Sequence, residues 1–227
     1  MNKLCTICMR KGSKGVKNKN IRKINGKYLM QYTIDQAVKS NLFDAIVVST
    51  DCKKILNISK KLGIENGFIR QKKLGNDTIG KLDVIKDALE KAEAIYSKKF
   101  DIIFDLDITS PLRKVKDIRD AYDIFIKNKY NNLFSVCSSK KNPYFNQVEY
   151  KNKKITLSKK VKNNIKRRQD APKVYDMNAS IYIWRRDTLL FSKSLFSDGA
   201  GIFEMPEERS IDIDSEHDLQ VVKFLMK

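Results

Sequence analysis

Residues 4–20 read LCTICMRKGSKGVKNKN, and this stretch decides the fold: a short apolar run, Leu4 to Met9, leads directly into a cationic loop with two glycines. The run has the length and composition of a buried strand. In an open α/β sheet the ligand crevice lies beyond the carboxyl ends of the strands, which is where this loop begins. The loop is therefore placed to meet a ligand.

The loop itself, residues 10–20, has the composition of an anion site. Its glycines let backbone amides turn toward a ligand, and five cationic side chains surround them, as a triphosphate requires. A solvated basic turn is the alternative interpretation. Gly12 and Gly15 do not complete the G-x-G-x-x-G pattern, so a dinucleotide fingerprint is absent.

Outward from this stretch, short β-type runs alternate with amphipathic segments, which predicts an α/β fold: a mostly parallel sheet flanked by helices. Strands are expected at residues 4–9, 45–49, 100–106, 133–136, 179–184 and 211–213, and helices at residues 30–40, 52–62, 82–96 and 117–127. A length of 227 residues suits one domain, 1–227.

Residues 138–169 break this alternation. Residues 147–150 (QVEY) and 155–157 (ITL) flank Lys151 to Lys154, which is typical of a β-hairpin that projects from the main sheet. Such an excursion often binds a second subunit, so we expect residues 138–169 to be an inserted dimerisation hairpin.

The chain carries 46 Lys and Arg against 27 Asp and Glu, a formal charge of +19, so an anionic partner is expected. Nucleic acid, a membrane surface and a nucleoside triphosphate all fit this charge. The densest basic cluster, residues 151–166, has few aromatic side chains on which bases could stack, so no nucleic-acid partner is the favoured interpretation. No stretch approaches the length of a membrane span, so no membrane partner is expected either.

The cysteines indicate packing and not chemistry. Cys5 and Cys8 form a C-x-x-C pair inside the first predicted strand, where their side chains would point to opposite faces. Core packing is favoured over redox or metal binding. The apolar start is too short for a signal peptide, and no framework of paired cysteines is present, so we expect a cytoplasmic protein.

A second glycine motif, residues 75–82, matches the Walker A spacing until Leu82, which stands where a Ser or Thr should hold magnesium. We interpret Asp77 and Thr78 as caps of the helix that follows.

Two late carboxylates, Asp212 and Asp214, alternate with isoleucines, so in a strand both would emerge on one face as oxygen ligands for magnesium. Solvent-facing charges at the start of the next helix are the alternative. Ser215 and Asp218 have capping-box spacing, and the lone histidine, His217, is expected at the surface.

Four motifs in chain order resemble the acylneuraminate cytidylyltransferases, the CMP-sialic acid synthetase family, over almost the whole chain. They are Arg10-x-x-Ser13-Lys14-Gly15 with Lys19-Asn20-Ile21; Arg70 with Asp77-Thr78; Thr109-Ser110-Pro111-Leu112-Arg113; and Arg167-Arg168-Gln169-Asp170-x-Pro172-Lys173 with Asn178, Tyr182 and Asp212-Ile213-Asp214.

The resemblance implies a Rossmann-like nucleotidyltransferase fold and a reaction in which CMP passes from CTP to an acidic nine-carbon sugar, with Mg²⁺ as cofactor. The implied roles fall into four groups. The catalytic residues would be Arg10, Lys14, Lys19 and Asp214. The nucleotide would be bound by Arg10, Ser13, Lys14, Lys19, Asn20, Arg70, Asp77 and Thr78. The sugar would be bound by Asp107, Thr109, Arg167, Arg168, Gln169, Asn178 and Tyr182. The metal would be bound by Asp212 and Asp214.

The resemblance further implies a homodimer, in which the hairpin crosses to the neighbour and Arg167 or Arg168 meets the sugar carboxylate of the adjoining site. A guanidinium can bind both oxygens of such a carboxylate.

Two departures concern the sugar. Asp107 stands where sialic acid members usually have Gln, and Asp176 stands where Arg is often found. Residues 105–107 and 176–180 look more like the branch that uses legionaminic acid. N-acetylneuraminate, pseudaminate and Kdo are the near alternatives, and a basic nucleic-acid-binding module is the distant one.

Overall fold

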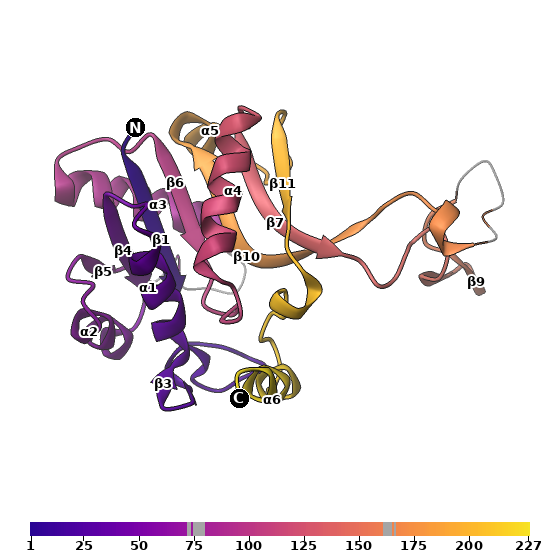
Figure 1. Cartoon of the computed structure of the whole chain (residues 1–227), viewed down its shortest axis with the longest axis horizontal. Coiled ribbons are helices and arrows are strands. Elements are labelled where there is room, and N and C mark those ends of the chain that lie inside the picture. Colours follow the sequence, from indigo (N-terminus) through magenta and orange to yellow (C-terminus); the bar gives the residue numbers. More distant parts are fainter. Residues whose placement is uncertain (72–73, 75–79, 161–164, 166) are drawn as a thin grey trace.

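The computed structural model describes residues 1–71, 74, 80–160, 165 and 167–227 (Figure 1). Its centre is a seven-stranded sheet with the spatial order β11 (Ala200–Glu204), β7 (Asn132–Ser138), β10 (Tyr175–Arg185), β6 (Ile102–Leu106), β1 (Lys3–Met9), β4 (Ala45–Thr50) and β5 (Gly67–Ile69). Six of these strands run parallel to one another and β10 alone runs against them. The predicted α/β fold with a mostly parallel sheet is confirmed.

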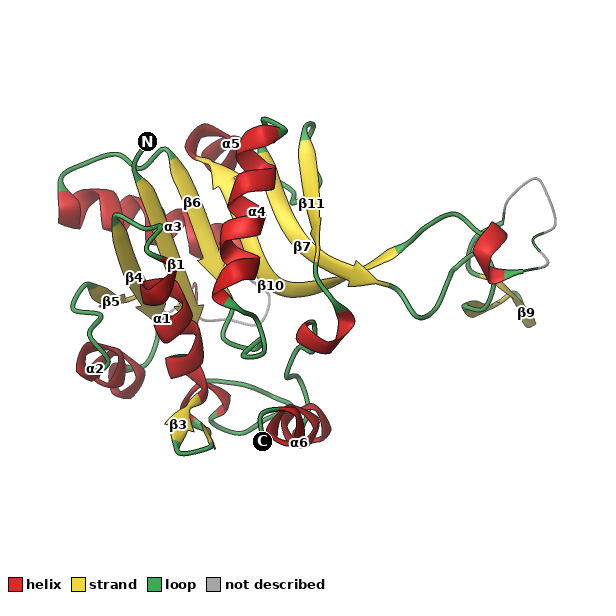
Figure 2. Cartoon of the chain, viewed as in Figure 1, coloured by secondary structure: helices red, strands yellow, loops and turns green. Residues whose placement is uncertain are grey.

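Helices cover both faces of this sheet (Figure 2). The larger core lies under α1 (Leu29–Ser40), α2 (Lys53–Lys61), α4 (Val115–Lys127) and α6 (Glu216–Leu225). The other core lies under α3 (Lys81–Tyr96) and α5 (Arg186–Phe191). Cys5 packs in the first core and Cys8 against the second, which confirms the opposite faces expected of the pair. No helix in the described part of the chain is long and apolar enough to cross a membrane.

The remaining elements are short. They are the 3-10 helices η1 (Lys19–Ile21), η3 (Arg168–Asp170) and η4 (Glu207–Arg209), the ribbon of β2 (Lys23–Ile24) with β3 (Lys27–Tyr28), and the ribbon of β8 (Val148–Lys151) with β9 (Lys154–Leu157).

The direction in which successive strands are added to the sheet reverses at β1. It runs outward from β1 to β4 and β5, and then returns to β6 on the other side of β1. Neighbouring strands whose connections leave in opposite directions open a crevice at their carboxyl ends. That crevice lies beyond Met9 and Leu106.

The expected hairpin is present as the β8–β9 ribbon, with Asn152 and Lys153 in its two-residue turn, both at positive φ. Figure 1 shows it at the far end of two long arms that extend β7 and β10 away from the body. Its role in dimerisation stays a prediction.

Three expectations about elements were incomplete or wrong. Residues 211–213 form no ladder with the sheet, so the strand expected there is wrong. The short edge strands β5 and β11 were not predicted, because each has few apolar residues in alternation. The N-cap of α3 is Gly80, not Asp77 or Thr78, which both lie outside the described residues.

One buried cation joins the sheet to α1. The guanidinium of Arg113, 2% exposed, donates to Gln36 Oε1, Thr33 Oγ1 and the carbonyl oxygens of Asp107 and Ser180, over 2.6–3.2 Å. Burial lowers the pKa of Arg113 to about 10, so the group stays charged at neutral pH. It therefore fixes the backbone of the loop after β6 against β10 and α1.

Replacing Arg113 by Met should lower the free energy of unfolding by about 3 kcal/mol or more, because several buried acceptors lose their donors together. Urea unfolding followed by circular dichroism measures this. Arg119→Met is the matched control: Arg119 is exposed and donates to Ser40 and Lys39 carbonyls at the surface, so its loss should cost less than about 1 kcal/mol. Equal losses in the two variants would contradict the structural role of Arg113.

Candidate active site

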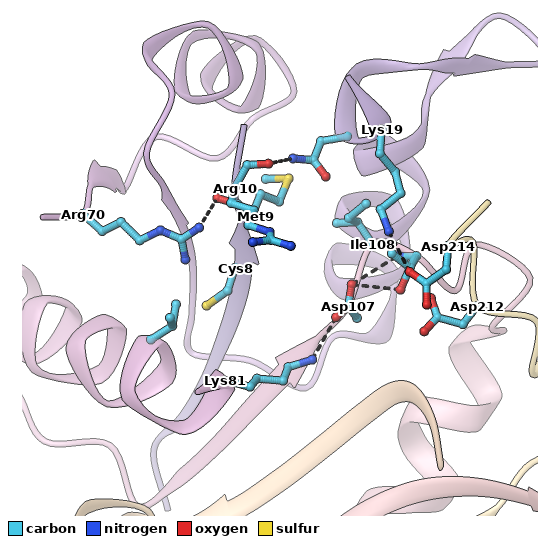
Figure 3. A pocket seen from close by; sticks show the side chains of 13 residues that line it. Cys8, Met9, Arg10, Lys19, Arg70, Lys81, Asp107, Ile108, Asp212 and Asp214 are labelled. Atoms are coloured by element: carbon cyan, nitrogen blue, oxygen red, sulfur yellow. Dashed lines mark hydrogen bonds and ion pairs between the residues drawn. The ribbon is translucent and has the colours of Figure 1, made fainter. Parts of the chain in front are cut away.

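A cavity of about 290 Å³ opens at the carboxyl ends of β1 and β6, where the direction of strand addition reverses (Figure 3). Eight residues expected from the sequence to form the site line it: Arg10, Lys19, Asn20, Arg70, Asp107, Thr109, Asp212 and Asp214. They come from four segments that are distant in the chain, so the fold brings most of the expected nucleotide and metal residues to one place.

The basic loop after β1 forms one wall of this cavity. Asn20 is buried and donates from Nδ2 to the Arg10 carbonyl oxygen at 2.7 Å, which closes the loop on itself. Ser13 and Lys14 lie on the same loop but do not line the cavity.

Gly15 brings this loop against residues 211–214, the acidic segment, which forms the opposite wall of the cavity. A Cβ added at Gly15 would overlap the carbonyl oxygen of Asp214, whereas one added at Gly12 would meet nothing within 4 Å. The glycine is needed at position 15 for close approach of two backbones.

The acidic segment is not a strand, and specific hydrogen bonds hold it in place. The Ile213 amide donates to the Thr109 carbonyl oxygen at 3.0 Å, and the Asp214 amide donates to Asp218 Oδ2 at 3.1 Å. The predicted capping box of Ser215 and Asp218 is confirmed, and it orients the start of α6. Asp212 and Asp214 consequently lie together on the cavity side, as Figure 3 shows.

Lys19 connects the two walls. Its Nζ donates to the Ile213 carbonyl oxygen at 2.7 Å and lies 3.1 Å from Asp214 Oδ1. The Lys19 side chain is 13% exposed, whereas the Asp214 side chain is 77% exposed. Within this ion pair, the Asp214 carboxylate is therefore the group that faces solvent.

The two carboxylates fit a divalent cation. Burial, with the neighbouring charges of Asp107 and Asp214, raises the pKa of Asp212 to about 6, and its Oδ1 is buried without a hydrogen bond among the described residues. A cation would compensate that oxygen. The described residues contain no group of three or more His, Cys, Asp or Glu side chains that could form a full metal cage. Mg²⁺ commonly uses one or two carboxylates and completes its shell with water and phosphates, so the pair suits it.

A second charged cluster forms the floor of the cavity. Lys81 Nζ lies 3.1 Å from Asp105 Oδ2, 2.9 Å from Asp107 Oδ2 and 4.1 Å from the centre of the Tyr182 ring. Burial alone would lower the pKa of Lys81, but Asp107 and Asp105 raise it well above its usual value. The pKa of Asp107 is lowered: burial opposes this shift, and Lys81 and Thr109 produce it. Lys81 and Asp107 therefore face each other as an ion pair at the floor of the cavity.

Lys81 was not predicted as a site residue. In the sequence it stands only as the lysine of the incomplete Walker A pattern, which indicates phosphate, whereas its partners in the structure are carboxylates.

Arg70 also lines the cavity; it is 5% exposed and donates from Nη2 to the Met9 carbonyl oxygen at 2.8 Å. Asp77 and Thr78, expected beside it, lie outside the described residues.

The expected sugar residues fall in three places. Asp107 and Thr109 line the cavity, and Tyr182 lies directly beneath Lys81. Asn178 is buried in the bulge of β10, where its amide bonds to Ser135 and Ser210. Arg167, Arg168 and Gln169 are not among the residues that line the cavity; they lie on residues 138–169, which Figure 1 shows extending away from the body of the chain.

Comparison with known proteins gives one family. The family model described as Cytidylyltransferase matches residues 4–223. Post-translational flagellin modification protein B from Campylobacter coli is 47% identical over 224 residues, which cover 99% of this chain and 94% of that protein. CMP-N,N'-diacetyllegionaminic acid synthase from Campylobacter jejuni subsp. jejuni is 48% identical over 223 residues, covering 98% of this chain and 94% of that protein.

The fold has solved counterparts. The structure of CMP:2-keto-3-deoxy-manno-octonic acid synthetase complexed with CTP superposes with a TM-score of 0.71 at 17% identity, covering 100% of this chain and 98% of that one. This likeness shows the fold.

Substituting Ala for Gly15 should lower the free energy of unfolding by about 1–3 kcal/mol, because the new methyl group forces the loop and the Asp214 backbone apart. Gly12→Ala in the same loop is the matched control and should be neutral or slightly stabilising, since its Cβ meets open space. Chemical unfolding curves of the two variants give both values. Equal stability of the two variants would show that the loop and the acidic segment do not touch at Gly15.

Proposed function

The chain belongs to the cytidylyltransferase family, and on this premise we propose that it transfers CMP from CTP to a sialic acid-like nine-carbon sugar, legionaminic acid. One observation carries the proposal. A basic loop, the carboxylates of Asp212 and Asp214, and the Lys81–Asp107 ion pair line a single cavity at the carboxyl ends of β1 and β6. This combination suits a triphosphate, its metal ion and an acceptor in contact with one another.

Two features support legionaminic acid as the acceptor. The relative that is 48% identical over nearly the whole chain is named as a CMP-N,N'-diacetyllegionaminic acid synthase. Asp107, the departure from the sialic acid pattern, lines the cavity beside the acidic segment. Both favour this branch over N-acetylneuraminate, pseudaminate and Kdo.

In the proposed reaction the oxygen of the sugar's anomeric hydroxyl bonds to the α-phosphorus of CTP. The bond from that phosphorus to the bridging oxygen of the β-phosphate breaks, pyrophosphate leaves, and the hydroxyl proton passes to solvent. Arg10, Lys14 and Lys19 would neutralise the phosphate charge, and Asn20 and Arg70 would seat the nucleotide. Such catalysis rests on positioning and on fixed charge, so it needs no histidine.

Asp212 and Asp214 are the residues that would hold Mg²⁺. Bound there, the ion supplies positive charge that neutralises the triphosphate. Lys19 lies beside Asp214 from the loop side, so the loop and the carboxylates act on the same phosphates.

We also propose a homodimer that uses the β8–β9 ribbon. Val148 pairs with Leu157, and Tyr150 with Ile155, so the four side chains share one face of the ribbon. Tyr150 and Ile155 are 75% and 72% exposed. An isolated two-stranded ribbon is marginally stable, and an apolar face on it calls for a covering surface. In a dimer that surface belongs to a second copy, and Arg167 or Arg168 would reach the sugar carboxylate in the partner's cavity.

The function is tested by offering the purified protein CTP, Mg²⁺ and each of several nonulosonic acids, and measuring released pyrophosphate. Release should be fastest with legionaminic acid. Asp214→Ala should lower kcat by about two to three orders of magnitude with the fold intact, because charge compensation at the phosphates is lost. Asp123→Ala, an exposed acidic residue on α4, is the control and should be unaffected. Activity with no acid sugar would reject the proposed function, and an active Asp214→Ala variant would reject the metal assignment.

The dimer is tested by sedimentation. Ile155→Glu puts a charge on the apolar face and should weaken association about tenfold or more. Thr156→Glu, on the opposite face of the same strand, should leave association unchanged. A wild-type protein that sediments only as a monomer at assay concentration would contradict the proposed homodimer.

A further inference from the structure

Lys81 lines the cavity but belongs neither to the basic loop after β1 nor to the acidic segment. It is the first residue of α3, and its ammonium lies between two carboxylates, that of Asp105 in β6 and that of Asp107 directly after the end of β6. Figure 3 shows it reaching Asp107 from the side of the cavity opposite Lys19. Lys81 therefore joins the start of α3 to the end of the central strand.

Asp105 explains why a cation is needed at this position. Its side chain is 1% exposed in the middle of the sheet, where Oδ1 accepts a hydrogen bond from Thr6 Oγ1 at 2.8 Å. A buried carboxylate without a nearby cation is strongly destabilising. Lys81 supplies that charge, and the Tyr182 ring, opposite Asp105 in the ladder, packs against the same ammonium.

Asp107 explains what the cation does for the cavity. Its Oδ2 accepts from Lys81 at 2.9 Å, and its Oδ1 accepts from the Thr109 amide and hydroxyl at 3.2 and 3.0 Å. An ionised carboxylate has about four acceptor positions, so these three contacts fix its orientation and leave room for about one more donor. The side chain is 24% exposed, and it lines the cavity.

We infer that Lys81 is a positioning residue for the acceptor sugar: it holds Asp107 so that the carboxylate accepts a hydrogen bond from a hydroxyl or acylamino N–H of that sugar. This inference rests on the proposed function. The sugar brings its own carboxylate, which an unneutralised Asp107 would repel. Lys81 cancels that repulsion while leaving the acceptor in place.

The experiment compares apparent KM values for the sugar and for CTP, with legionaminic acid as the probe sugar. Lys81→Met should raise the KM for the sugar about tenfold or more and change the KM for CTP less than about threefold. Asp107→Asn, which replaces the acceptor oxygen or turns it away, should raise the KM for the sugar similarly. Lys86→Met on the same helix is the matched control: Lys86 bonds to the Ser192 carbonyl oxygen outside this cavity, and both KM values should stay at the wild-type level.

A double variant protects the test against misfolding. Lys81→Met leaves the buried carboxylate of Asp105 without a cation. The double variant Lys81→Met with Asp105→Asn removes that carboxylate and still leaves Asp107 without its cation. The double variant should therefore fold and keep the raised KM for the sugar. A purely structural role of Lys81 predicts instead a double variant with wild-type KM values, which would overturn the inference.

Two further outcomes are distinguishable. If Lys81 itself binds the substrate, Asp107→Asn frees its ammonium and the KM for the sugar stays equal or falls, which also overturns the inference. If the wild-type protein releases no pyrophosphate with any acid sugar, the proposed function fails, and this inference fails with it.

Discussion

The hydrogen bonds of the buried Arg113 guanidinium are the interaction on which the site depends. They join three elements: α1 through Thr33 and Gln36, the loop after β6 through Asp107, and the bulged part of β10 through Ser180. β10 is the strand that runs against the rest of the sheet, and Ala179 in its bulge has a φ of 50°. The ladder with β7 is interrupted between Met177 and Tyr182, and within this interruption Arg113 donates to the Ser180 carbonyl group. The direction of Asp107, and hence the floor of the cavity, follows from this arrangement.

Above that floor, two lysines compensate carboxylates in different ways. Lys19 is largely buried, but it pairs with Asp214, whose side chain is mostly exposed, so solvent screens the attraction between them. A phosphate or a metal ion can therefore take over either member when it arrives. Lys81 pairs with Asp105, which is buried, and separating that pair would leave an uncompensated charge inside the protein. The first pair suits transient contacts with the reacting groups, and the second suits a permanent part of the binding surface.

The sequence predicted the parts of the fold and site that local pattern encodes. The first strand with its basic loop, the alternation of strands and helices, the hairpin, and the capping box at Ser215 are all contiguous signals. The shared location of Asp212 and Asp214 was also predicted, but for the wrong reason. No ladder holds that segment; the carbonyl group of Thr109, the side chain of Asp218 and the close contact at Gly15 do. Alternation in the sequence described the direction of the side chains without identifying what fixes it.

Lys81 could not be found in this way, because its partners are 24 and 26 positions along the chain and belong to another element. Nothing in the pattern around it distinguishes a lysine that meets phosphate from one that meets carboxylate. The same limit applies to Arg113, whose contacts span residues 33 to 180. Most of the residues proposed to contact the triphosphate lie in one short contiguous loop, since a triphosphate needs many donors from one turn of backbone. The residues proposed to shape the acceptor side are single side chains from separate elements, so on this proposal the choice of sugar depends on tertiary contacts that only the folded chain brings together.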